Sequence, residues 1–273
     1  MTGIERIQSR FTDNESLCKK AIAPFVTAGD PDLSTTAELL QVMDKAGATL
    51  IELGVPYSDP IADGGVIQAS YVRALERGMT LDNLFEMIRN VSAKISTPVL
   101  AMVSYSIIFR RGINTFVNEA VEAGLAGFVV PDLPIEESGE LADASEAKGL
   151  ALVRLVTPTT PPERAEIIAR QSTGFLYCVS IAGVTGARHT LPEGLIERVK
   201  WLRTKTDVPI LVGFWISSPD QAKAIASVAD GVIIGSAIVK HLIGAADASQ
   251  EALMTSVGHY VKDLVTAVES VVD

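Results

Sequence analysis

The sequence has few cysteines and histidines, and none of the patterns in which these residues bind a metal or act as nucleophiles. Its 273 residues contain two cysteines, Cys18 and Cys178, and three scattered histidines, His189, His241 and His259. Neither cysteine has metal-ligand spacing, and no histidine belongs to a nucleophile motif. We therefore expect no bound metal, two buried or incidental thiols, and a reducing compartment.

An excess of positive charge is also missing. The chain carries 23 Lys and Arg against 33 Asp and Glu, a net charge of -10, and no basic block offsets it. This balance argues against a nucleic acid or an anionic membrane as the partner. A negatively charged substrate would need a local site, such as the N-terminal ends of helices.

Long apolar segments are absent as well. No apolar run reaches the ~20 residues that span a bilayer, and residues 1–11 are polar, without the apolar core of a signal peptide. With 48% hydrophobic residues the chain can still build a large core. We predict a soluble, cytoplasmic protein.

Eight apolar runs do stand out, and nearly all of them precede a segment with helical periodicity. The runs lie at about 21–29, 50–55, 98–104, 127–134, 150–157, 175–182, 209–216 and 231–234. They are apolar throughout rather than alternating, which is typical of parallel strands buried on both faces. Eight such β/α units predict a (β/α)8 TIM barrel, with 1–273 as one domain.

Further helical segments exceed the eight-fold repeat. They predict an extra N-terminal helix over about 1–12 and extra helices after the second strand (66–77 and 81–94) and after the eighth (235 onward and 247–269). A doubly wound sheet is the alternative, but no strand leads into the G-x-G-x-x-G of a dinucleotide-binding helix.

Three local features bear on helix ends. Thr160 to Glu163 reads as a capping box with proline at the first helical position, and Ser218 reads as the N-cap of the helix that follows it. Arg110 and Arg111 read as the solvated start of the helix over 112–123.

Glu52 is a carboxylate inside the second apolar run. Burying such a charge costs several kcal/mol unless it is paired or protonated, so an edge strand or a structural ion pair is one explanation. In a barrel, however, functional residues lie at the C-terminal ends of strands. Glu52 is near such an end and Asp63 is in the loop that follows, so two carboxylates in different environments would share one rim. Asp132 ends the fourth run at the same rim, and could be catalytic, loop-organising or partner-facing.

Small residues follow the last three apolar runs, in Ala182–Gly186, Gly213–Ser218 and Gly235–Ala237. Loops at this position in TIM barrels commonly bind phosphate through backbone N–H groups. Tight strand-to-helix turns would explain any single glycine, but three adjacent strand ends together favour a phosphate site.

These motifs resemble the tryptophan synthase α chain family. Residues 52–64 read Glu-Leu-Gly-Val-Pro-Tyr-Ser-Asp-Pro-Ile-Ala-Asp-Gly, and residues 24–31 read Pro-Phe-Val-Thr-Ala-Gly-Asp-Pro. The segments 131–134, 183–186, 213–214 and 235–237 follow in that family's order, so the resemblance covers essentially the whole chain.

The resemblance implies a lyase that cleaves indole-3-glycerol phosphate to indole and glyceraldehyde 3-phosphate by a retro-aldol reaction, the penultimate chemistry of L-tryptophan biosynthesis. It implies that Glu52 is the general acid/base that protonates indole C3 and that Asp63 accepts a hydrogen bond from the indole N–H. Tyr177 would lie near the reacting side chain, and Phe25 and Ile67 would enclose the indole.

The same resemblance implies the rest of the binding site and the partner. Thr185 would contact Asp63, and the phosphate would lie on the backbone around Gly186, Gly213, Phe214, Trp215, Gly235 and Ser236. The partner is expected to be a β chain in an α2β2 assembly, which contains pyridoxal phosphate and receives the indole; no cofactor is implied for this chain. Asp59 and the segments 104–110 and 132–136 would face the β chain.

The sequence departs from the family pattern at three places. Trp215 stands where the family usually has glycine, which allows close approach of backbone to ligand. Ser104 and Ser106 flank Tyr105 where an aromatic residue and an asparagine are usual, and Gly65 replaces a common proline. Two alternatives to a working lyase subunit therefore stay open: a weakly or non-catalytic activator of the β chain, and a free-standing indole-releasing lyase.

Overall fold

The computed structural model describes residues 1–60, 63–180, 194–213, 216–244 and 248–271, and it forms a closed barrel of eight parallel strands. Consecutive strands pair in chain order, and β8 pairs with β1 to close the barrel. The predicted (β/α)8 barrel is confirmed. The strands are β1 (Ala21–Thr27), β2 (Ile51–Gly54), β3 (Val99–Met102), β4 (Gly127–Val129), β5 (Ala151–Val156), β6 (Leu176–Val179), β7 (Ile210–Gly213) and β8 (Gly231–Ile234).

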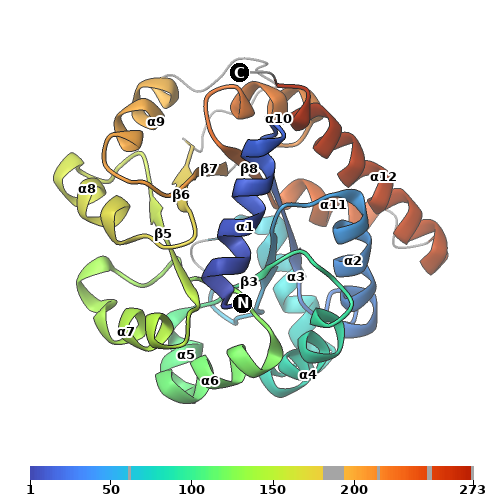
Figure 1. Cartoon of the computed structure of the whole chain (residues 1–273). Coiled ribbons are helices and arrows are strands. Elements are labelled where there is room, and N and C mark those ends of the chain that lie inside the picture. The colour runs from blue at the N-terminus through green and yellow to red at the C-terminus, as the bar shows by residue number, and fades with distance from the viewer. Residues whose placement is uncertain (61–62, 181–193, 214–215, 245–247, 272–273) are drawn as a thin grey trace.

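Helices form a ring around the strands (Figure 1). The extra helices predicted after β2 and β8 are present. The helices are α1 (Gly3–Ser16), α2 (Leu33–Ala46), α3 (Gly65–Glu76), α4 (Leu81–Ser92), α5 (Tyr105–Arg111), α6 (Ile113–Ala123), α7 (Gly139–Ala147), α8 (Pro162–Gln171), α9 (Leu195–Arg203), α10 (Pro219–Ala226), α11 (Ser236–Gly244) and α12 (Gln250–Glu269), with a 3-10 turn at Ile135–Glu137.

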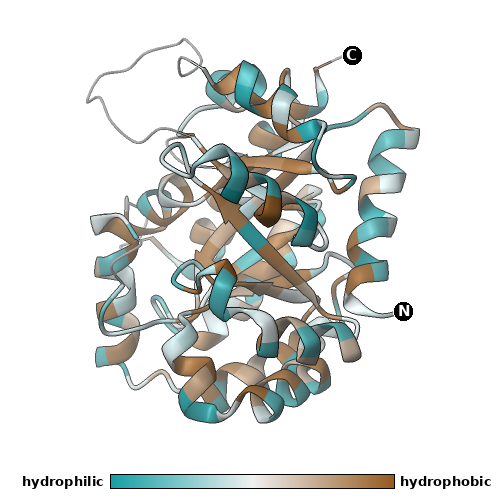
Figure 2. Cartoon of the chain, turned by 90° about the vertical axis from the view of Figure 1, so that its left-hand side faces the viewer, coloured by the Kyte–Doolittle hydropathy of each residue, from teal (hydrophilic) through white to brown (hydrophobic). Residues whose placement is uncertain are grey.

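The strands are buried on both faces, as their continuous apolar sequences predict; every residue of β1 is buried. One set of side chains fills the barrel interior, and the alternate set packs against the helices. In Figure 2 the helices turn apolar faces toward the barrel and polar faces outward. The interior set includes Ala23, Leu50, Leu100, Val153, Phe175, Tyr177, Leu211 and Ile233.

Helix α1 crosses the N-terminal end of the barrel (Figure 1). Its N-cap Thr2 and Glu5 form a capping box, and Ile7 is fully buried in the interior cluster. The N–H of Ile4 donates to the carbonyl of Gly149, just before β5, at 2.9 Å. Because α1 covers this end, the opposite rim, where the strands end, is the one that remains for a site.

Two local predictions were wrong, and one was confirmed. Thr160 is not an N-cap: its Oγ1 accepts from the N–H of Thr157 at 3.0 Å, and the N-cap of α8 is Pro161, although a proline, Pro162, does occupy the first helical position as predicted. Arg110 and Arg111 end α5, a helix too short for its periodicity to be recognised, and Gly112 at φ 87° separates it from α6. Ser218 caps α10 as predicted, accepting from the Gln221 N–H at 3.3 Å.

Within the described residues, no helix combines the length and the hydrophobicity needed to span a membrane.

Candidate active site

Glu52 lies on an internal strand and projects into the barrel. β2 pairs with β1 and β3, and in this register Glu52 lies beside Phe25 and Leu100. The side chain is 1% exposed, and its Oε1 has no hydrogen-bond partner in the part of the chain that the structure describes. Both alternatives for Glu52, an edge strand and a structural ion pair, are therefore wrong for the described residues. Burial raises the pKa of Glu52 to about 8, so its carboxyl group is mainly protonated at neutral pH.

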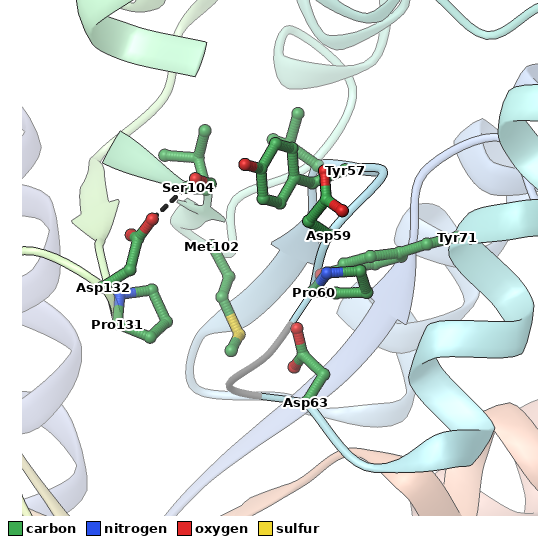
Figure 3. Close-up of a pocket in the computed structure, with 11 residues that line it drawn as sticks. Tyr57, Asp59, Pro60, Asp63, Tyr71, Met102, Ser104, Pro131 and Asp132 are labelled. Carbon is green, nitrogen blue, oxygen red and sulfur yellow. Dashed lines mark hydrogen bonds between the residues drawn. The ribbon is translucent and has the colours of Figure 1, made fainter. Parts of the chain in front are cut away.

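Asp63 comes from the loop between β2 and α3. Gln68 of α3 holds this loop, because its Nε2 donates to the carbonyls of Asp63 at 2.8 Å and Pro60 at 3.1 Å. The Asp63 carboxyl group faces a cavity that Tyr71, Met102 and Asp132 also line (Figure 3). Burial and, second, the negative charge of Asp132 raise the pKa of Asp63 to about 6. Asp63 is therefore mainly ionised at neutral pH, where Glu52 is mainly protonated.

Two tyrosines flank these acids. Tyr177 extends from β6 and Tyr71 from α3, and both are buried. Each hydroxyl lies where a glycine leaves room: a Cβ on Gly213 would lie 2.4 Å from the Tyr177 hydroxyl oxygen, and one on Gly54 would lie 2.8 Å from that of Tyr71. Burial and the charges of Glu52 and Asp63 raise the pKa of both phenols well above the usual range. Both tyrosines are therefore protonated hydrogen-bond donors.

Sequence reasoning identified Tyr177 and missed Tyr71. A usable signal existed, because Tyr71 follows Ile67 by four residues in a predicted helix and therefore lies on the same helical face.

The residues predicted to enclose an indole lie together. Phe25, Tyr71 and Val239 form a small buried cluster, with Ile67 and Met102 packed against it. A Cβ on Gly235 would contact Ile67 Cδ1 and Phe25 Cβ, each at 3.7 Å. The end of β8 therefore adjoins the apolar wall.

The predicted phosphate site is described only in part. Gly213 ends β7, and Gly235 precedes α11, where its carbonyl accepts from the N–H of Ile238 at 2.9 Å. Ser236 is the first residue of that helix, and the N–H groups of Ser236 and Ala237 come too early in it to have an intrahelical acceptor. Thr185, Gly186, Phe214 and Trp215 lie outside the described residues.

Asp132 organises the loops on the far side of the cavity. Its carboxylate accepts from the Ser104 hydroxyl at 2.6 Å and from the Tyr105 N–H at 2.9 Å, at the start of α5 (Figure 3). The Ser104 and Ser106 hydroxyls hydrogen-bond to each other at 2.9 Å. The loop-organising interpretation of Asp132 is thereby confirmed, and its charge also reaches Asp63.

Chemically, this rim combines a buried acid that retains its proton, an ionised carboxylate, two phenol donors and an apolar wall. Such a pair of carboxyl groups can divide proton transfer from charge stabilisation. Among the described residues, no three His, Cys, Asp or Glu side chains group together in a way that could hold a metal ion.

Comparison with known proteins places these features in one family. The family model described as tryptophan synthase alpha chain matches residues 11–268. The chain is 47% identical over 250 residues to the tryptophan synthase alpha chain of Microcystis aeruginosa, covering 91% of this chain and 94% of that one. It is 51% identical over 223 residues to that of Synechocystis sp., covering 81% and 84% respectively.

Solved structures agree with these sequence relatives. The crystal structure of the tryptophan synthase alpha chain from Legionella pneumophila superposes with a TM-score of 0.87 at 33% identity, covering 97% of this chain and 98% of that one. A crystal structure of tryptophan synthase from M. tuberculosis in an aminoacrylate-bound form gives a TM-score of 0.85 at 27% identity, covering 96% and 99%.

Proposed function

This chain belongs to the tryptophan synthase alpha chain family, and from that premise we propose how its own residues perform the family's reaction. The chain is a lyase that cleaves indole-3-glycerol phosphate to indole and glyceraldehyde 3-phosphate. The observation that carries the assignment of roles is the environment of Glu52, a carboxyl group that is 1% exposed and mainly protonated at neutral pH.

Glu52 acts first as a general acid. It gives its proton to C3 of the indole, which turns the ring system into a cationic indolenine. Apolar neighbours favour this role, because Phe25 and Leu100 beside Glu52 supply no charge that would stabilise the carboxylate before the proton leaves.

Asp63 stabilises the positive charge that then develops. Its carboxylate accepts a hydrogen bond from the indole N–H, and a fixed negative charge in a buried site stabilises the intermediate more strongly than water does. The bond between C3 and the glycerol side chain then breaks. The electron pair returns to the ring, the side-chain hydroxyl releases its proton as its carbon becomes an aldehyde, and the Glu52 carboxylate takes up that proton.

The remaining roles concern binding. Tyr177 lies beside the reacting side chain, and Phe25 and Ile67 cover the indole. Backbone N–H groups near Gly186, Gly235, Ser236 and residues 213–215 hold the phosphate, and Thr185 contacts Asp63. The start of α11 supports this part of the proposal, since the N-terminal end of a helix favours a bound anion.

Members of the family need no cofactor of their own and have a β-chain partner. We propose that Asp59 and the segments 104–110 and 132–136 contact the β chain in an α2β2 assembly, and that pyridoxal phosphate belongs to β. Helix α5 supports this surface, because Phe109 on it is 67% exposed and its ring centroid lies 6.0 Å from that of Tyr105, with the two rings tilted by 48°. We further propose that residues 1–273 act as one domain in the cytoplasm.

The experiment that tests the function is a measurement of indole release from indole-3-glycerol phosphate by the purified chain, alone and with a β chain. A working subunit releases indole, and faster with β. No indole under either condition, with stimulation of β retained, would identify a non-catalytic activator. High turnover alone, with no effect of β, would identify a free-standing lyase.

A further inference from the structure

Tyr71 is a buried residue of the site to which the reaction steps above assign no role. It lies one turn after Ile67 on α3 and is 3% exposed. Its ring packs in the cluster with Phe25 and Val239, against which Ile67 and Met102 also pack. Tyr71 therefore belongs to the same wall as Phe25 and Ile67, which cover the indole in the proposed site.

The Tyr71 side chain reaches from α3 across to the end of β2. A Cβ on Gly54 would lie 2.8 Å from the Tyr71 hydroxyl oxygen and 2.4 Å from Cζ of Phe25. Gly54 follows Glu52 by two residues and thus lies on the same face of the strand. The phenol consequently occupies space beside Glu52 that a side chain at position 54 would otherwise fill.

Tyr71 also adjoins Asp63. Both residues line one cavity (Figure 3). Among the charges that act on the Tyr71 phenol, that of Asp63 has the largest effect and that of Glu52 the next. The ring thus lies near the carboxylate that accepts the indole N–H.

We propose that Tyr71 is a specificity-determining residue, whose ring limits the space beside the indole nitrogen and selects substrates unsubstituted at the ring positions that flank it. The inference rests on the proposed function, in which Asp63 binds the indole N–H. Positions 2 and 7 of indole flank this N–H, whereas position 5 lies on the opposite edge of the ring. An apolar pocket discriminates against one additional methyl group by roughly 10- to 200-fold.

The test uses the reverse condensation of glyceraldehyde 3-phosphate with indole, 2-methylindole, 7-methylindole or 5-methylindole, in the presence of a β chain. The wild-type protein is expected to disfavour 2-methylindole or 7-methylindole. Tyr71→Leu should raise kcat/KM for the disfavoured analogue, relative to indole, by about tenfold. The ratio for 5-methylindole should stay within about twofold, which makes it the internal control.

Two further variants separate ring size from the hydroxyl group. Tyr71→Phe keeps the ring and should keep the wild-type selectivity, while Tyr71→Trp should sharpen it. The inference is overturned if folded Tyr71→Leu retains the wild-type ratios, or if Tyr71→Phe changes them as much as Tyr71→Leu does.

Failure of the proposed function gives a different result. A wild-type protein that makes no product with any indole refutes the proposed lyase function, but it does not refute the role of Tyr71 in limiting the space of the pocket. Calorimetric titration of indole and the three methylindoles into the wild-type protein and Tyr71→Leu then measures the affinity of the pocket for each compound directly. Equal selectivity of binding in the two proteins would overturn the role of Tyr71 independently of turnover.

Discussion

Phe25 of β1 and Glu52 of β2 are direct partners in the parallel register, so an aromatic ring and a buried carboxyl group project side by side into the barrel. Leu100 of β3 lies on the other side of Glu52. The carboxyl group therefore lies between two apolar neighbours on an internal strand, which explains why burial alone raises its pKa to about 8. In the proposed function, this pairing brings the substrate-contacting Phe25 and the proton-transferring Glu52 to one position of the sheet.

The first prediction concerns Glu52→Gln. The amide keeps the size of the side chain but carries no transferable proton, so turnover should fall by roughly 100-fold or more. Affinity for glycerol phosphate, measured by calorimetry, should change by less than about twofold. Glu76→Gln, an exposed change on α3, is the matched control and should retain wild-type turnover. An active Glu52→Gln protein would show that another group moves the proton.

The second prediction concerns the stability of the same variant against pH. The folded-state pKa of Glu52, about 8, lies above the ordinary value of 4.5. Between these values the unfolded chain loses the proton and the folded chain keeps it, so the contribution of Glu52 to stability falls as pH rises. Glu52→Gln has no titrating carboxyl group at this position, so its stability does not fall for this reason as the pH rises.

As the pH rises from about 5 to about 8, the free energy of unfolding of Glu52→Gln should therefore increase relative to that of the wild type, by at most roughly 5 kcal/mol. Urea unfolding of both proteins at the two pH values measures the change. A difference that is constant with pH would mean that Glu52 titrates in its ordinary range.

The sequence could predict the barrel because its strands are continuous apolar runs, a pattern that burial on both faces requires. It could also place Glu52, since a charge in such a run is costly wherever it points. Helix α5 was not predictable, because seven residues give too little periodicity and its start depends on Asp132, 27 residues from Tyr105. The spacing of Tyr71 from Ile67 could have shown that the two share a helical face, but the proximity of Tyr71 to Gly54 and to Asp63 exists only in the folded chain.

The third prediction concerns the acid limb of the pH profile. If the reaction needs ionised Asp63, kcat/KM should fall as pH drops through about 6. The charge of Asp132 contributes, after burial, to the raised pKa of Asp63. Asp132→Asn removes that charge and should therefore move the acid limb of the profile to lower pH.

Asp59→Asn provides the comparison for this measurement, because Asp59 lines the same cavity but does not contribute to the pKa shift of Asp63. Its acid limb should coincide with that of the wild type. If the acid limb of Asp132→Asn also coincided with that of the wild type, the charge of Asp132 would not affect the titration of Asp63.

The fourth prediction comes from the departure of Trp215 from the family pattern. Glycine allows the backbone to approach a phosphate more closely than tryptophan does. Trp215→Gly should therefore bind glycerol phosphate more tightly, by about tenfold if one charge-assisted hydrogen bond is restored. Calorimetry measures this directly, and unchanged affinity would refute an obstructing tryptophan.

The fifth prediction concerns the support of Tyr177 by Gly213. A Cβ at position 213 would lie 2.4 Å from the Tyr177 hydroxyl oxygen and 2.8 Å from two ring carbons, Cε1 and Cζ. Gly213→Ala must therefore displace the tyrosine, at a cost of about 1–3 kcal/mol in the free energy of unfolding. Because the proposed function places Tyr177 beside the reacting side chain of the substrate, kcat should fall as well.

Gly139→Ala separates this steric effect from the general effect of replacing a glycine. Nothing lies within 4 Å of a Cβ at Gly139, the first residue of α7, so alanine there should be neutral or slightly stabilising. Thermal unfolding and steady-state indole release on both variants give the comparison. If Gly213→Ala matched Gly139→Ala in both measurements, Tyr177 could move without loss, and its position over Gly213 would not matter for the reaction.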